Sequence, residues 1–184
     1  MAPQIFLIAP VDADAASFVA SLERSRARAA FAALLLPRGS RPENAYKDFV
    51  KAVAPVAQAA GSAVLIEGEP GLVRTLGADG LHVTAGAAAT RDAIAALQPA
   101  NIVGVGNVHT RHDAMTLGEL GADYLLFGPL TGHLDAAERA LAQWWAQTME
   151  IPSVLSDPDA GLADFDAGAC EFIGLGTARL EEHA

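Results

Sequence analysis

Short apolar runs recur along the chain, separated by longer stretches in which apolar and polar residues mix. A continuous apolar run bounded by turn residues is typical of a buried parallel strand, and Ala- and Leu-rich segments between such runs favour helices. The pattern therefore predicts strands that alternate with helices. The predicted strands are QIFLIAP at 4–10, AALLLP at 32–37, AVLIEG at 63–68, GLHVTA at 80–85, NIVGVGN at 101–107, YLLFGPL at 124–130, PSVLSD at 152–157 and EFIGLG at 171–176.

One short motif repeats along this alternation. LGADGLHVTAG at 76–86 returns as LGADYLLFGPL at 120–130 and, more faintly, as AGACEFIGLG at 167–176. Its glycines, Gly77, Gly121 and Gly168, are spaced by 44 and 47 residues. A helix–strand unit takes about 20 to 25 residues, so the motif marks every second unit. In each copy we expect a helix to end at a glycine with positive φ, before a buried strand begins.

Eight strands alternating with helices predict a compact (β/α)8 TIM barrel in one domain over residues 1–184. The alternative is an open doubly wound sheet. Because 184 residues are fewer than the typical 250 or so, the connections must be short and the final helix, Thr177 to Ala184, takes two turns at most. The expected helix starts are Asp12, Pro42 with Glu43, Thr90 with Asp92, and Asp157 with Pro158.

Composition narrows the function classes. The chain has 22 acidic and 12 basic residues, a formal net charge of -10, which disfavours nucleic acids and anionic membranes as partners. No apolar run approaches the roughly 18 to 20 residues of a membrane-spanning helix, and the N-terminus lacks a basic segment, so we expect a cytoplasmic protein. Cys170 stands alone, which excludes a disulfide within the chain and predicts a small buried residue.

Three segments in order resemble a known family. GADGLHV, VGVGNVHT and GADYLLFGP, within residues 77–129, resemble the thiamine-phosphate synthase/TenI family of TIM barrels. The resemblance implies a site at the carboxyl ends of the strands. It also implies a transferase-like reaction in which a thiazole phosphate displaces pyrophosphate from a pyrimidine diphosphate, with magnesium held by acidic residues.

The synthase pattern fails after the second, third and fourth predicted strands. Where the family has Gln and Arg to grip pyrophosphate, this chain has Leu34 and Leu36, and only Arg38 remains to replace the family's lysine. Glu67 and Glu69 are the remaining acids near the metal position, and the family's second metal ligand is missing. At i and i+2 on an extended segment both carboxylates face one side, which permits joint coordination of a hard cation. With no third acidic ligand in the pattern, magnesium is expected only if synthase activity survives.

The pattern also changes after the sixth and seventh predicted strands. Thr131 is kept, but His133 stands where the family has a phosphate-binding lysine, and LSDPDA replaces a Gly-Gly pair. Asp157 and Asp159 would repel a phosphate placed there. These departures argue against synthase activity in a chain that otherwise resembles the family.

A phosphate site near the last strand is a further hypothesis. In GLGTAR, Gly174 and Gly176 allow close approach of the backbone, Thr177 offers a hydroxyl and Arg179 a charge, and Ser156 faces them from the seventh strand. The alternative is an ordinary glycine-rich strand end.

His109, just after the fifth strand, aligns with the histidine that moves a proton in TenI-type thiazole tautomerases, and its ordinary pKa near 6.5 suits proton transfer. The alternative is a loop histidine bonded to a backbone group or to water. His82 lies in the apolar alternation LHV and is expected to be a core residue.

Three functions remain open. The first is a divergent family barrel that binds a small phosphorylated or heterocyclic ligand, with thiazole tautomerase-like chemistry at His109. The second is a synthase with a rearranged site, in which Arg38, Glu67, Glu69 and His133 replace the usual ligands. The third is a non-catalytic barrel for interaction or regulation.

Two adjacent tryptophans bear on the oligomeric state. On a helix, the side chains of Trp144 and Trp145 diverge by about 100°, so one of them is expected to be partly exposed. An exposed tryptophan predicts a homodimer interface, and the alternative is a wide core-facing stripe.

Overall fold

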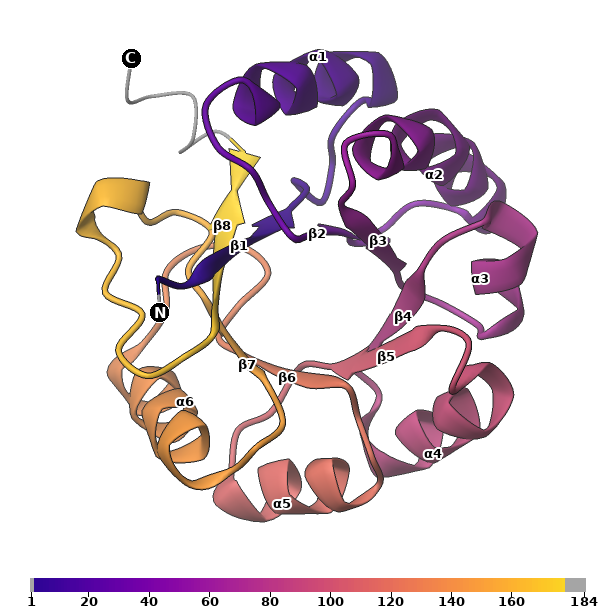
Figure 1. Cartoon of the computed structure of the whole chain (residues 1–184). Coiled ribbons are helices and arrows are strands. Elements are labelled where there is room, and N and C mark those ends of the chain that lie inside the picture. Colours follow the sequence, from indigo (N-terminus) through magenta and orange to yellow (C-terminus); the bar gives the residue numbers. More distant parts are fainter. Residues whose placement is uncertain (1, 178–184) are drawn as a thin grey trace.

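The eight strands form a closed parallel barrel in the order of the chain (Figure 1). The structure, a computed structural model, describes residues 2–177. The first strand pairs with the last over five residues, from Gln4 opposite Phe172 to Ile8 opposite Gly176. This pairing closes the barrel, so the predicted (β/α)8 fold is confirmed and the open doubly wound sheet is wrong.

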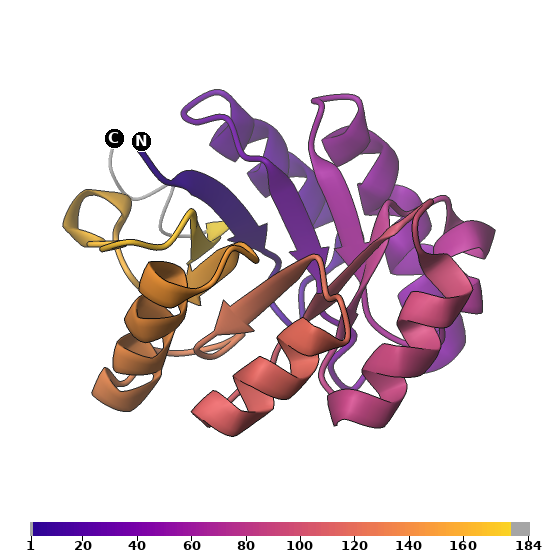
Figure 2. The same cartoon turned by 60° about the horizontal axis from the view of Figure 1, so that its bottom comes forward.

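The strands are short and the helices lie outside them (Figure 2). The strands are β1 (Gln4–Ile8), β2 (Ala33–Leu36), β3 (Ala63–Ile66), β4 (Gly80–Val83), β5 (Ile102–Val105), β6 (Tyr124–Phe127), β7 (Ser153–Ser156) and β8 (Phe172–Gly176). The helices are α1 (Ala15–Arg26), α2 (Glu43–Gln58), α3 (Gly71–Leu76), α4 (Gly86–Leu97), α5 (Arg111–Glu119) and α6 (Ala136–Thr148), followed by the 3-10 helix η1 (Leu162–Asp164). No helix among residues 2–177 is both long and apolar enough to cross a membrane.

Two predicted helix starts are displaced. Helix α1 is capped by Asp14, whose carboxylate accepts the N–H of Ser17, and not by Asp12. Helix α4 begins at Gly86, so Thr90 lies inside it. The Thr90 hydroxyl donates to the Gly86 carbonyl one turn earlier at 2.9 Å, which satisfies this buried residue without a capping role. Helix α2 begins at Glu43 as predicted.

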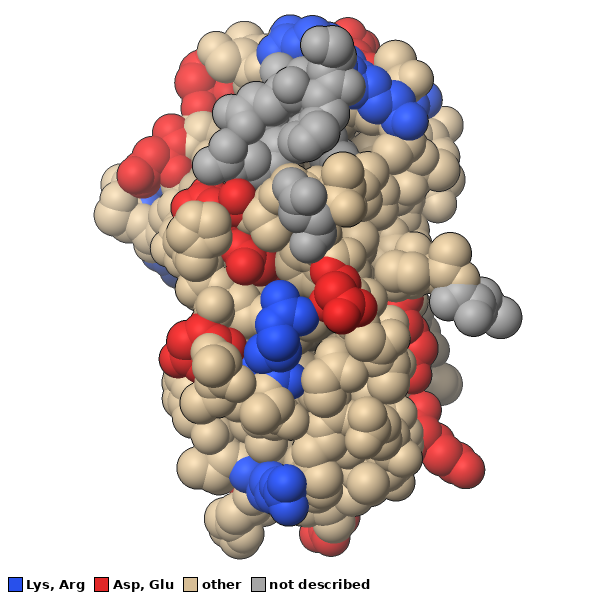
Figure 3. All heavy atoms as spheres, turned by 90° about the vertical axis from the view of Figure 1, so that its left-hand side faces the viewer, with Lys and Arg blue, Asp and Glu red and all other residues tan. Residues whose placement is uncertain are grey.

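The predicted seventh helix is absent from the described part of the chain. Asp157 does not open an α-helix: its carboxylate, the group that would cap one, lies 3.1 Å from the Nδ1 of His133, and its N–H donates to the Gly174 carbonyl. The segment that follows β7 contains only η1 and turns, which leaves a gap in the ring of helices between α6 and α1 (Figure 1). Of the predicted final helix, residues 178–184 lie outside the described residues. In Figure 3, which faces this side, acidic and basic side chains are scattered over a mostly uncharged surface.

The repeated Gly-Ala-Asp motif ties neighbouring units together. Gly77 ends α3 with φ +67. Two residues later, the Asp79 carboxylate accepts the N–H of Val64, the second residue of the preceding strand, at 2.7 Å, and the Gln58 amide at 3.0 Å. Gln58 also donates to the Gly77 carbonyl at 2.8 Å. One glutamine at the end of α2 therefore holds the turn that starts β4.

The other copies repeat this clamp. Asp123 accepts from Val103 at 2.7 Å and from Gln98 at 3.0 Å, and Gln98 also donates to the Gly121 carbonyl. In the third copy Gln143 donates to the Ala167 carbonyl, while Glu171 replaces the aspartate and accepts from the N–H and hydroxyl of Ser153. The motif is thus architectural and marks every second unit, as its spacing predicts.

The core has an inner part within the barrel and an outer part between strands and helices. His82 lies in the inner part, 2% exposed, as predicted for a core histidine. Its Nδ1 is 2.8 Å from the Tyr124 hydroxyl, while its Nε2 has no partner. Burial lowers the pKa of His82 to about 4, so the ring is neutral at pH 7. Cys170 is a buried free thiol in the outer core.

Candidate functional site at the carboxyl end of the barrel

The largest cavity described here opens at the carboxyl ends of β1, β6, β7 and β8. Its volume is about 690 Å³, within the usual range of about 300 to 1,000 Å³ for small-molecule sites. The lining comes from the loops after these four strands and from the first turns of α1. The lining residues are Ile8, Ala9, Pro10, Val11, Asp12, Ala13, Asp14, Ser17, Phe18, Ser21, Leu130, Thr131, Gly132, Pro158, Asp159, Gly176 and Thr177.

The polar lining of this carboxyl-end cavity consists of carboxylates and hydroxyls. Asp12, Asp14 and Asp159 are exposed in it, and no Lys or Arg is among the lining residues within 2–177. Hydrogen bonds from the Ser17 backbone N–H and hydroxyl hold the pKa of Asp14 below its ordinary value, so this carboxylate stays charged. This lining is suited to hydrogen-bond donors and positive charge. Arg41, which is not among the lining residues, donates from its guanidinium to the carbonyls of Val11 and Ala13 in the first loop.

Three residues predicted to contact a ligand line the cavity: Thr131 of the loop after β6, and Gly176 and Thr177 of the last-strand phosphate site. A Cβ on Gly176 would come within 2.6 Å of the Pro158 carbonyl, so only glycine permits this close approach. Gly174 lies deeper, where a Cβ would sit 3.0 Å from Ser156. Arg179 lies outside the described residues.

Two other residues predicted to contact a ligand, Ser156 and His133, interact with neighbouring residues of the protein instead. Ser156 is fully buried, and its hydroxyl donates to the Pro129 carbonyl at 2.6 Å. The Nδ1 of His133 lies 3.1 Å from Asp157, whose side chain is only 12% exposed. The His133 ring is therefore turned toward Asp157, and neither Ser156 nor His133 lines the cavity.

The residues predicted to replace the pyrophosphate and metal ligands lie on another side of the barrel mouth. The Arg38 backbone N–H donates to the Glu67 carboxylate at 2.8 Å, while its guanidinium Nε donates to the Arg41 carbonyl at 3.2 Å. Burial raises the pKa of Glu67, and the Arg38 hydrogen bond and charge partly offset that rise. Glu69 is exposed. Within residues 2–177 no three His, Cys, Asp or Glu side chains are grouped closely enough to hold a metal ion.

His109 is exposed and is oriented by a neighbour. Its Nε2 lies 2.8 Å from Asn107 Oδ1, and the Asn107 amide nitrogen donates to the Thr84 carbonyl at 3.3 Å. Because an amide oxygen only accepts, Nε2 carries the proton and Nδ1 is left as the base in the neutral ring. Asn107, but not His109, lines a cavity of about 570 Å³ between the loops after β4 and β5.

Sequence reasoning missed the contribution of the first loop. Val11, Asp12, Asp14 and Ser17 line the cavity, although the sequence suggested only a helix start here. The signal was present in PVDAD, a polar segment directly after the first apolar run. In a closed barrel the loop after β1 must meet the loop after β8, so closure itself predicts this contact.

The comparisons with known proteins agree with the fold. The family model described as thiamine monophosphate synthase matches residues 5–156. The chain belongs to the thiamine monophosphate synthase family. A thiamine-phosphate synthase of Rhodospirillum centenum is 31% identical over 156 residues, which cover 82% of this chain and 75% of that protein. A thiamine-phosphate synthase of Hyphomonas neptunium is 35% identical over 161 residues, 82% of this chain and 73% of that protein.

A solved structure supports the same architecture. The thiamine phosphate pyrophosphorylase from Pyrococcus furiosus superposes with a TM-score of 0.76 over 96% of this chain and 87% of that one. At 15% identity it supports the fold alone. The family match ends at Ser156, directly before the segment in which this thiamine monophosphate synthase family member has η1 in place of an α-helix.

Proposed function

We propose that this family member binds a small heterocyclic molecule in the carboxyl-end cavity, without a requirement for magnesium. The observation that carries the proposal is the cavity lining of carboxylates and hydroxyls over an apolar wall of Ile8, Phe18 and Leu130. An apolar wall takes the faces of a heterocycle, and the carboxylates take its donors or positive charge. Of the two ligand classes expected from the sequence, the lining favours the heterocycle over a phosphorylated compound.

Thermal unfolding tests this proposal with a graded set of probes. The set is a neutral hydroxyethylthiazole, the thiazolium cation thiamine, thiamine phosphate, and pyrophosphate with and without magnesium. We expect thiamine to raise the melting temperature most and pyrophosphate to leave it unchanged. A probe at 100 times its Kd stabilises the fold by about 2.7 kcal/mol.

An exchange of one carboxylate for its amide locates the binding. Asp159→Asn removes a charge from the cavity, and we expect thiamine binding to weaken by up to about fivefold, since an exposed charge pair contributes about 0.2 to 1 kcal/mol. Asp92→Asn, at an exposed position of α4, is the matched control and should leave the Kd unchanged. Equal Kd values for wild type and Asp159→Asn, or stabilisation by pyrophosphate alone, would contradict the proposal.

Proton transfer by His109 would be a separate, catalytic function, because His109 lines neither the carboxyl-end cavity nor the cavity beside Asn107. Its support is the hydrogen bond to Asn107, which leaves Nδ1 free to accept a proton. If the chain is a tautomerase, His109→Ala abolishes proton exchange on the thiazole ring, followed by NMR in deuterated water, while the melting temperature stays within a degree or two. Exchange that persists in His109→Ala would assign the chemistry elsewhere.

The second candidate function is the synthase reaction, which the curated relatives at 31% and 35% identity favour. Against it stand the half-buried Glu67, which has no second carboxylate beside it to complete a metal site among residues 2–177, and the acidic character of the cavity. The synthase would need cations or a metal to neutralise the charge of the departing pyrophosphate. The geometry supplies these less well than it supplies a binding site for a heterocycle.

A further inference from the structure

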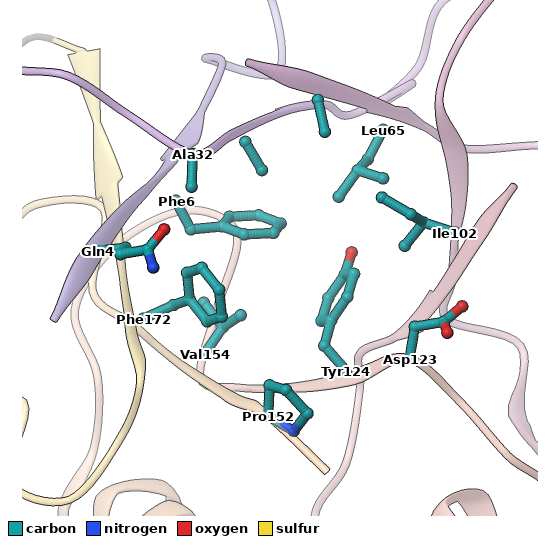
Figure 4. Close-up of a pocket in the computed structure, with 12 residues that line it drawn as sticks. Gln4, Phe6, Ala32, Leu65, Ile102, Asp123, Tyr124, Pro152, Val154 and Phe172 are labelled. Carbon is teal, nitrogen blue, oxygen red and sulfur yellow. The ribbon is translucent and has the colours of Figure 1, made fainter. Parts of the chain in front are cut away.

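A second cavity, of about 270 Å³, lies at the amino end of the barrel (Figure 4). It is lined by residues at or next to the beginnings of the strands, so it is at the opposite end from the carboxyl-end cavity. Most of its lining is apolar, and three aromatic rings, from Phe6, Tyr124 and Phe172, form part of its wall. We refer to it as the amino-end cavity.

Small residues in inward-facing positions leave this space. Ala33 of β2 lies opposite Ala63 of β3 in the sheet, and both line the amino-end cavity. TIM barrels normally fill such layers with bulky branched side chains. Ala32, Ala33 and Ala63 present only methyl groups to the cavity, so this layer of the barrel is left partly unfilled beside Leu65 and Ile102.

The aromatic wall is held in place before any ligand binds. Phe6 and Tyr124 meet edge to face with their centroids 5.4 Å apart. The Tyr124 ring rests on Gly104, where a Cβ would come within 1.9 Å of it, and the Tyr124 hydroxyl is bonded to His82. A fixed wall loses little conformational freedom when it receives a ligand.

Polar groups are few in the amino-end cavity. The Asp123 carboxylate is turned away from the centre (Figure 4), toward the N–H of Val103 and the amide of Gln98. The Tyr124 hydroxyl is paired with His82. Gln4 is exposed and carries the side-chain amide of the lining. One hydrogen-bonding group thus stands beside an apolar interior.

We propose that the amino-end cavity binds a small planar aromatic molecule whose single polar group faces Gln4. An apolar cavity of about 150 Å³ holds benzene, so 270 Å³ accommodates a bicyclic ring such as indole. The ring walls provide edge-to-face and stacked contacts. The proposal is independent of the function proposed above.

The surface argues for a small molecule and against a protein partner. A stable protein interface buries about 800 Å² on each partner, much of it apolar at its centre. Among residues 2–177 the only exposed large hydrophobic side chain is Leu162 of η1, which does not line the cavity. The apolar surface at the amino end is therefore confined to the cavity itself.

Binding of indole, followed by the shifts of methyl resonances and by thermal unfolding, tests the proposal. Ala63→Leu puts a larger side chain into the cavity from a half-buried position, and we expect the Kd for indole to rise at least tenfold. Ala95→Leu is the same exchange on the exposed side of α4 and should bind like wild type. Absence of binding to wild type, or equal binding by Ala63→Leu, would overturn the site.

A second pair of measurements tests the ligand chemistry. Gln4→Leu should weaken indole, whose N–H donates to the amide oxygen, and leave its carbon analogue indene unchanged. Equal effects on both would refute the role of Gln4. A dimer in light scattering that Ala63→Leu dissociates would replace the small molecule with a second copy of the chain.

Discussion

At the scale of single residues, His82 shows how the barrel interior sets the state of an ionisable group. Its ring stacks beside Tyr124, with centroids 5.8 Å apart, in space that glycines provide: a Cβ on Gly106 would come within 2.5 Å of Nε2. No carboxylate accepts from it, so burial alone decides its charge. A positive ring would lose its hydration without compensation, and the neutral form is favoured.

This pKa predicts a loss of stability in mild acid. The unfolded chain binds a proton at His82 below its ordinary pKa of about 6.5, whereas the folded chain does so only near 4. Unfolding is therefore favoured as the pH falls between these values, by roughly 3 kcal/mol in total. Urea unfolding at pH 7, 5.5 and 4.5 should show this slope.

His82→Gln should flatten the slope, and His112→Gln, at an exposed position of α5, controls for the substitution itself. If His82→Gln keeps the wild-type slope between pH 6.5 and 4, His82 does not carry this acid sensitivity.

At the scale of elements, the Gly-Ala-Asp clamp explains how a chain with such short strands keeps its register. Asp79 and Gln58 join α2, β3 and the start of β4 in one hydrogen-bonded group, and Asp123 with Gln98 does the same two units later. Without the carboxylate, the N–H of Val64 at the start of β3 would lose its acceptor. An unpaired buried donor costs more than the hydrogen bond itself contributes.

A double-mutant cycle measures the clamp. Asp79→Ala should lower the free energy of unfolding by about 1 to 3 kcal/mol. Gln58→Ala should cost less, because it leaves Val64 paired. Since both residues share one network, their effects should deviate from additivity by more than 0.5 kcal/mol. Strictly additive losses in urea unfolding would show that the two side chains act separately.

The elements also show where sequence reasoning holds and where it stops. The apolar runs and the Gly-Ala-Asp spacing predict all eight strands, since both depend on contacts local to one unit. The predicted start of α4 at Thr90 is wrong. Threonine is a common capping residue, but the Thr90 hydroxyl satisfies itself inside the helix by donating to the carbonyl of Gly86, one turn earlier. In place of the α-helix expected after Asp157 the chain has turns and η1, and the carboxylate expected to cap that helix lies against His133, 24 residues earlier, a contact that local sequence does not reveal.

At the scale of the whole molecule, the barrel has two open ends of different character. The carboxyl end gathers carboxylates and hydroxyls from loops distant in the sequence, while the amino end is an apolar cavity with aromatic walls. Thr131, Gly176 and Thr177 could be predicted for the first because they follow strand ends. Asp14 and Ser17 could not be assigned to the carboxyl-end cavity from sequence, because their place beside the last strand depends on closure of the barrel. The amino-end cavity could not be predicted either, because it depends on which inward-facing residues are small.

Membership of the family does not by itself establish the synthase reaction in this chain. The match over residues 5–156 places the chain in the thiamine monophosphate synthase family. The expected substitutes for the synthase ligands do not gather in one site: the Arg38 backbone N–H donates to Glu67, the His133 ring lies against Asp157, and Glu69 is exposed. A subunit interface at Trp144 stays a prediction; the Arg111 guanidinium lies 4.6 Å from the centre of its ring.

The most direct test of this account is the synthase reaction itself. Thiazole phosphate, pyrimidine diphosphate and magnesium are incubated with this protein and, in parallel, with the Rhodospirillum centenum relative, and thiamine phosphate is quantified by chromatography. The account predicts product from the relative and none above background from this chain, while thiamine still raises its melting temperature without magnesium. Magnesium-dependent turnover at a rate comparable to that of the relative would contradict the account.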